Sequence, residues 1–177
     1  MTELVTPAER YRASYFAAKA EDAHAARITD EQFAALLARF ADYAAGRDLK
    51  PGHVAETTLW FVDGDDYIGR ISLRHALTPL LRAIGGHVGY DVRPSRRRQG
   101  HATRMLELAK PRLAALGIDP ALITCDDTNV ASRKVIEACG GVPATEHVPL
   151  DDVLRDADDE LKALLAAPQL RFWLPTQ

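Results

Sequence analysis

The chain has 177 residues, 47% of them hydrophobic and 27% charged, which is the composition of an ordinary globular protein with one core. Its formal net charge of -3 disfavours proteins that bind nucleic acid across a broad basic surface. No apolar run approaches the ~20 residues of a membrane span, and the first residues lack the pattern of a secretory signal. The two cysteines, Cys125 and Cys139, are too few for a disulfide scaffold and lack metal-ligand spacing, so we expect a cytoplasmic protein without a metal site.

The first half of the chain predicts helices followed by antiparallel strands. Residues 7–45 have helical spacing of apolar residues, with a Thr-x-x-Gln capping box at Thr29. Residues 57–62 and 67–73 are rich in β-branched and aromatic residues and flank the turn sequence DGDD, so they predict a hairpin. A short helix within 74–86 and a strand over 87–92 should follow.

The second half alternates strands and helices. One helix opens at Gly100 and ends at Gly117, and a second is capped by Thr128 or Asn129. The other expected elements are strands over 121–125, 142–148 and 171–175 and an acidic helix over 150–167. This order predicts one mixed α/β domain.

The heptapeptide RRRQGHA, residues 96–102, lies between an expected strand and an expected helix. The first N–H groups of a helix have no partner within it, and the helix dipole favours negative charge there. Gly100 lets an anion approach the backbone closely, so the stretch predicts a phosphate site. Neither a P-loop nor a GxGxxG fingerprint is present; the pattern is Arg97-x-x-Gly100-x-Ala102.

This loop, read as YDVRPSRRRQGHATRMLELA, resembles the acyl-CoA pyrophosphate loop of the GNAT superfamily of N-acetyltransferases, and TCDDTNVASRKVIEACGG (124–141) resembles the family's next strand and helix. The resemblance implies an α/β GNAT fold, a single domain with a central mixed, mostly antiparallel twisted sheet flanked by helices. It divides the chain into a helical part (1–50), an acyl-CoA-binding core (about 55–148) and an acidic helix with a final strand (149–177).

The resemblance also implies a site and a co-substrate, acetyl-CoA. Backbone amides of the loop would cradle the pyrophosphate, the end of the preceding strand would pair with the pantetheine arm, and Asn129 and Ser132 would lie near that arm. The implied binding residues are Tyr90, Asp91, Val92, Arg97, Arg98, Gln99, Gly100, His101, Ala102, Thr103, Asn129 and Ser132.

The implied reaction is direct attack of a primary amine on the acetyl thioester. Many members carry a tyrosine as general acid at a position that is Ile136 here, so Tyr90 is a candidate substitute. His87 is the first candidate for the base, because an unperturbed histidine titrates near ~6.5. Glu56, Asp126 and a water molecule without a dedicated residue are the alternatives.

Two alternative functions and the identity of the acceptor stay open at this point. The missing tyrosine keeps alive a non-catalytic acyl-CoA-binding or regulatory module on the same fold. A nucleic-acid binder using the arginine run is disfavoured by the net charge. The sequence does not specify which small-molecule or peptide amine is the acceptor, although residues 11–55 and 74–86 should build its site. A homodimer through the final strand is a further expectation.

Overall fold

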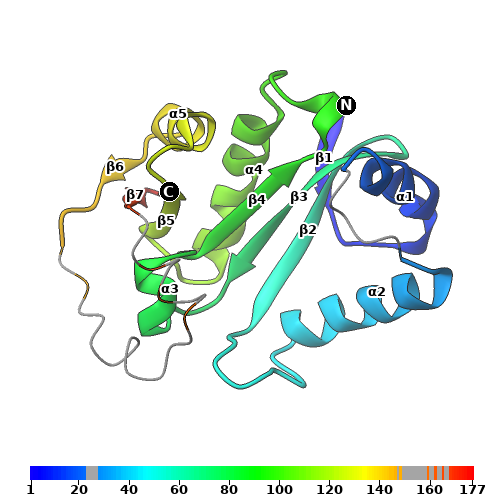
Figure 1. Cartoon of the computed structure of the whole chain (residues 1–177), viewed down its shortest axis with the longest axis horizontal. Coiled ribbons are helices and arrows are strands. Elements are labelled where there is room, and N and C mark those ends of the chain that lie inside the picture. Colours follow the sequence, from blue (N-terminus) through cyan, green and yellow to red (C-terminus); the bar gives the residue numbers. More distant parts are fainter. Residues whose placement is uncertain (23–27, 147, 149–158, 160–161, 163–164, 166–167) are drawn as a thin grey trace.

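The computed structural model describes residues 1–22, 28–146, 148, 159, 162, 165 and 168–177. Its helices cover both faces of a four-stranded antiparallel sheet, with α1 and α2 on one side and α4 on the other (Figure 1). The sheet has the order β1-β2-β3-β4, and its strands are Thr2–Val5, Glu56–Asp63, Asp66–Arg74 and Val88–Val92. The helices are α1 (Arg12–Ala20), α2 (Asp30–Ala44), α3 (Pro79–Ala83), α4 (His101–Ala115) and α5 (Val130–Ala138), with 3-10 turns at Glu9–Tyr11 and Pro94–Arg96.

A second, three-stranded sheet completes the described fold. Its strands are β5 (Ala121–Asp126), β6 (Val142–Pro143) and β7 (Gln169–Leu174), in the order β5-β7-β6. Because β7 has β5 on one edge and β6 on the other, its backbone is already paired on both sides. β7 therefore offers no free edge for pairing with a second copy of the chain. The expected homodimer through this strand stays a prediction.

Most expected elements are confirmed. The capping box is present, since Thr29 Oγ1 accepts from the Gln32 N–H and the Gln32 side chain accepts from the Thr29 N–H. The second helix of the C-terminal half is capped by Asn129. The strand expected over 142–148 is only two residues long, and the acidic helix over 150–167 lies outside the described residues apart from 159, 162 and 165.

Two apolar clusters hold the layers together. On the face of α1 and α2, Trp60 is completely buried among aromatic rings and stacks on Tyr15 with centroids 4.9 Å apart. On the opposite face, Met105 and Leu106 of α4 pack with Ile71 of β3 and Ile136 of α5. In both clusters apolar side chains of the helices pack against those of the sheet, and burial of this surface holds the layers together.

The two sheets meet where β4 and β5 begin. The His87 N–H donates to the Leu122 carbonyl at 2.7 Å, and the Gly85 N–H donates to Thr124 Oγ1 at 2.7 Å. Gly86 lies against this contact with φ +59, and a Cβ on it would approach the Leu122 carbonyl oxygen to 2.4 Å. After the contact the strands belong to separate sheets, so they diverge as a wedge toward the loop that precedes α4.

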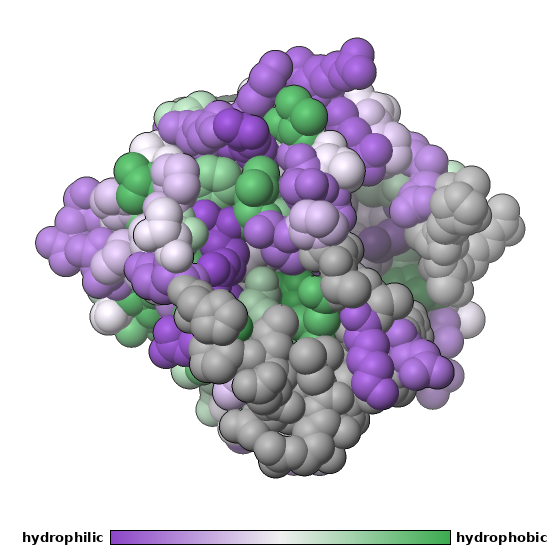
Figure 2. All heavy atoms as spheres, turned by 60° about the vertical axis from the view of Figure 1, so that its left-hand side comes forward, coloured by the Kyte–Doolittle hydropathy of each residue, from purple (hydrophilic) through white to green (hydrophobic). Residues whose placement is uncertain are grey.

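The surface turned forward in Figure 2 is largely polar, with apolar atoms showing in patches between polar ones. Among the described residues, no helix is both long enough and apolar enough to span a bilayer.

Gly86→Ala should lower the free energy of unfolding by about 2 kcal/mol or more, because the added methyl meets backbone and a positive φ is strained for alanine. Gly64→Ala is the matched control, since Gly64 has φ +57 and nothing within 4 Å, and it should cost only about 1 kcal/mol. Urea denaturation of both variants measures the difference. Equal losses would show that the β4–β5 contact tolerates a side chain.

Candidate functional site

The loop between β4 and α4 exposes a row of backbone donors. Gly100 adopts the left-handed conformation, with φ +78, and nothing lies within 4 Å of the position where its Cβ would be. The N–H groups of residues 98–103 have no hydrogen-bond partner among the described residues, and they precede or open the 15-residue helix α4. Partnerless donors at a helix N-terminus favour an anion. The family resemblance implies this role for the amides from Arg97 through Thr103, but the Arg97 N–H donates to the Pro94 carbonyl at 3.3 Å.

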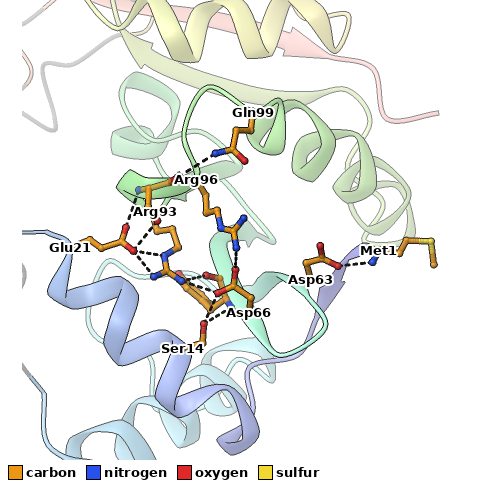
Figure 3. Close-up of polar contacts among 10 residues, drawn as sticks. Met1, Ser14, Glu21, Asp63, Asp66, Arg93, Arg96 and Gln99 are labelled. Atoms are coloured by element: carbon orange, nitrogen blue, oxygen red, sulfur yellow. Dashed lines mark hydrogen bonds and ion pairs between the residues drawn. The ribbon is translucent and has the colours of Figure 1, made fainter.

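Two of the arginines near this loop are held by carboxylates from distant elements (Figure 3). Arg93 bonds Glu21, which closes the C-terminal end of α1, and its Nη1 donates to Asp66 Oδ1 at 2.9 Å. Arg96 also pairs with Asp66. The Arg93 side chain is only 12% exposed, so these bonds compensate a largely desolvated charge.

Glu21 binds the loop backbone as well as the guanidinium. Its carboxylate accepts from the Ser95 N–H at 2.9 Å and from the Ser95 hydroxyl at 2.8 Å. The Arg93 guanidinium, with help from Ser95, lowers the pKa of Glu21 to about 2. Hydrogen bonds of Glu21 therefore connect α1 to the loop between β4 and α4. No local sequence pattern predicted this connection.

Arg97 and Arg98 remain as uncompensated charges beside the open amides. Neither makes an ion pair with a described residue, and Arg97 uses only its Nε, which donates to the Val92 carbonyl at 3.0 Å. Arg98 has φ +60, a strained value for a side-chain-bearing residue at the tightest part of the loop. The structure thus separates the arginine run into two anchors and two cations available to a ligand.

β4 presents unpaired backbone groups to the wedge. The Arg74 N–H donates to the His87 carbonyl, and the Arg93 N–H donates to the Ile68 carbonyl. In an antiparallel ladder such bonded residues alternate with unbonded ones, so Tyr90 and Val92 turn their backbone groups away from β3. Because β5 has diverged here, the Tyr90 N–H and C=O face the wedge without a strand partner.

Side chains of β4 and α5 meet across the same wedge. The Tyr90 hydroxyl lies 2.8 Å from Ser132 Oγ, and burial raises the pKa of Tyr90 to about 12. Asn129 does not reach this point; its Oδ1 caps α5 by accepting from the Ser132 N–H at 3.0 Å. Burial likewise raises the pKa of Cys125, which lies beside Ser132.

Three further positions fall into supporting roles. Ile136 is fully buried in the core, so the hydroxyl at the wedge comes from β4. His101 packs edge-on against Phe61 with centroids 5.8 Å apart, and its Nε2 is buried without a partner. The Asp91 side chain turns away from the wedge and bonds Arg70 at 2.6 Å.

His87 contributes to the joining of the strands. Its Nδ1 accepts from the Leu122 N–H at 2.9 Å, so the neutral ring carries its proton on Nε2. Burial, reinforced by Arg82 and Arg74, lowers the pKa of His87 to about 4. A ring with one nitrogen engaged and so low a pKa is a weak base, and the geometry favours a structural role.

A strand wedge edged by free backbone groups and closed by an amide-lined loop has the shape and donors that suit an elongated ligand with a phosphate part. The chain belongs to the acetyltransferase (GNAT) domain family, whose model matches residues 3–142. The resemblance seen in the sequence is thereby confirmed. Comparison with curated proteins finds no match.

Solved acetyltransferases share the fold across nearly the whole chain. The microcin C7 self-immunity acetyltransferase MccE, in complex with acetyl-CoA and AMP, has a TM-score of 0.64 and 11% identity over 98% of this chain and 92% of its own. The Salmonella typhimurium enzyme that modifies the N-terminal serine of ribosomal protein L7/L12 has a TM-score of 0.59 and 14% identity over 97% and 92%. The Escherichia coli ribosomal-protein-S18-alanine N-acetyltransferase has 0.53 and 14% over 100% and 95%.

The role of His87 can be checked by stability measurements. An unfolded chain binds a proton at histidine near pH 6.5, whereas the folded ring resists protonation until about 4, so unfolding becomes easier as pH falls through this window. His87→Gln removes the titration and keeps a hydrogen-bond acceptor. The stability of the native chain minus that of the variant should therefore fall between pH 6.5 and 4 and be constant above pH 7; a flat difference would contradict the assignment.

Proposed function

We propose that the protein is an N-acetyltransferase, which transfers the acetyl group of acetyl-CoA to a primary amine. The observation that carries the proposal is the row of unpartnered N–H groups at Gly100 beside the wedge on β4. Membership of the acetyltransferase family and the acetyl-CoA complex of MccE support it.

The residues present fit acetyl-CoA along its length. The amides of residues 98–103, with the charges of Arg97 and Arg98, suit the pyrophosphate. The Tyr90 carbonyl and the Val92 N–H, which both turn away from β3, suit the pantetheine amides, which can add to β4 as a further strand partner would. Among the described residues no group of three or more potential ligands could hold a metal ion.

The proposed reaction is direct attack. The amine nitrogen bonds the thioester carbonyl carbon, the carbon–sulfur bond breaks, and CoA leaves as a thiolate while the amine loses a proton. The Tyr90 N–H, which has no strand partner, is placed to stabilise the carbonyl oxygen as it becomes negative. An acyl-cysteine route is less suited, because the raised pKa of Cys125 keeps its thiol protonated.

Tyr90 is the proposed donor to the leaving sulfur. Its hydroxyl stays protonated at neutral pH because burial raises its pKa to about 12, and so it can donate a hydrogen bond to a developing thiolate. The thiolate of a free thiol forms near pH ~8.5, so stabilisation by a hydrogen bond suffices and full proton transfer is not required.

None of the three side chains expected from the sequence is a favoured base. Glu56 pairs with Arg74, Asp126 accepts from Thr128, and Nδ1 of His87 is engaged. We therefore propose that the acceptor attacks as a neutral amine and passes its proton to water. An α-amine with a pKa of ~8 is partly neutral at physiological pH.

A second candidate is a non-catalytic acyl-CoA sensor on this fold. It is favoured by Ile136, a core residue at the position where many family members carry the acid. CoA binding without thiol release across a panel of amines would select it.

The acceptor class can be narrowed by analogy with the solved enzymes. One of them modifies the N-terminal serine of a ribosomal protein, and another is a ribosomal-protein-S18-alanine N-acetyltransferase. A peptide α-amine is therefore a reasonable acceptor to test first. The two free, buried cysteines suit a reducing compartment such as the cytoplasm.

Gly100→Leu should weaken acetyl-CoA binding about tenfold or more, since a side chain there fills the space before the amides. Gly140→Leu is the matched control, because Gly140 has φ +88 and equally open surroundings at the end of α5. Isothermal titration calorimetry of both variants provides the comparison. If both variants kept the native affinity, the loop would not be part of the binding site.

Tyr90→Phe should lower kcat about tenfold with little change in KM for acetyl-CoA, because the hydroxyl acts on the departing sulfur. Ser132→Ala removes the same hydrogen bond but keeps the phenol, and its kcat should fall less. Steady-state thiol release measures both variants, and thermal melts record their stability. Equal losses of kcat would assign Tyr90 a purely structural role.

A further inference from the structure

A cavity of about 570 Å³ lies between α1, α2 and the middle of β3. Leu36 and Phe40 of α2 give it an apolar wall, and Tyr15 of α1 contributes a ring. Figure 1 shows both helices over the face of the sheet opposite α4. The volume is in the range of small-ligand sites.

The charged residues that line this cavity are all cations. They are Lys19, Arg39 and Arg70, and among the described residues no carboxylate lines it with them. Arg70 is compensated by Asp91 at 2.6 Å, whereas Arg39 makes no hydrogen bond or ion pair with any described residue. Lys19 lies over the Tyr15 ring, 5.4 Å from its centroid.

The cationic groups act on one region of the cavity. Burial raises the pKa of the Tyr15 hydroxyl, and the charge of Arg70 opposes that rise. The Asp91 carboxylate adds to the rise, and the charge of Arg39 opposes it. Because Asp91 offsets Arg70, the net positive charge beside this hydroxyl comes from the uncompensated guanidinium of Arg39 on α2 and from Lys19.

The cavity adjoins a second one that extends toward the proposed acetyl-CoA site. Arg70 lies directly opposite Asp91 in the β3–β4 register, and the next residue, Tyr90, faces the wedge. A smaller cavity of about 250 Å³ shares Lys19 and Arg70 with the first and reaches Arg97 of the loop. An acceptor in the larger cavity can thus direct its amine along β4 toward the wedge.

We propose that the cavity between α1 and α2 holds the acceptor, and that this acceptor carries an anionic oxygen group, a carboxylate or a phosphate, in addition to its amine. The inference rests on the proposed function and names the substrate class that it leaves open. Arg39 is the residue that selects the anion, because its charge is free to bind and its guanidinium can form two parallel hydrogen bonds with such a group.

The experiment compares matched pairs of acceptors that differ in one charge. Alanyl-glutamate amide is set against alanyl-glutamine amide, and phosphoethanolamine against ethanolamine, with thiol release as the readout. Each anionic member should have a kcat/KM about three- to tenfold higher than its neutral partner. The two pairs distinguish a carboxylate from a phosphate preference.

Three variants test the residue. Arg39→Gln should abolish the preference, Arg39→Lys should keep part of it, and Arg112→Gln, at an exposed arginine of α4 outside the cavity, should leave it intact. Calorimetry can measure how the two peptides bind to the CoA-saturated protein. It should show the same preference for the anionic peptide without turnover.

The outcomes separate the two proposals. Acetyl-CoA binding without thiol release overturns the proposed function, and the calorimetric contrast then still decides whether the cavity selects an anion. Equal use and equal binding of charged and neutral partners, or a preference that survives Arg39→Gln, overturns the inference while the acetyltransferase assignment stands.

Discussion

The contact between the first residues of β4 and β5 is the constraint on which the site depends. Two strands are held together at one end only, by the backbone of His87 and Leu122, and each then continues with a different partner. Backbone hydrogen-bonding groups of a strand are costly to leave unpaired away from water. Beyond this contact the edge of β4 carries unpaired N–H and C=O groups. A ligand with amide groups could form hydrogen bonds with them.

The arginine-rich loop shows how a fold can assign different tasks to adjacent, chemically identical side chains. A 3-10 turn at Pro94–Arg96 rotates successive guanidinium groups in different directions. Arg93 is turned inward to Glu21 and Asp66, whereas Arg97 and Arg98 stay beside the open amides. The buried pair fixes the loop at a cost in desolvation, and only the remaining charges can be used for recognition.

The sequence was informative wherever the determining interactions are local. The strand, glycine and helix order at Gly100 predicted the amide-lined loop, and the pattern at Thr29 predicted a helix start, because both depend on residues within one turn. Interactions over long separations were invisible: Glu21 is 72 residues from Arg93 and has no motif around it. His87 shows the limit of residue type as a guide, since a backbone N–H 35 residues away engages the nitrogen that a base would need.

Glu21 also ties the two halves of the site to each other. It closes α1 two residues after Lys19, which lines the cavity of that helix, and it holds the Ser95 backbone ahead of the α4 loop. If the cavity holds the acceptor as proposed, a small shift of α1 on its occupation would reach the loop through these bonds. The affinities for the two substrates are then thermodynamically linked, and by reciprocity each ligand changes the binding of the other by the same factor. Substitutions in α1 that favour a new acceptor would therefore also change the affinity for the acyl donor.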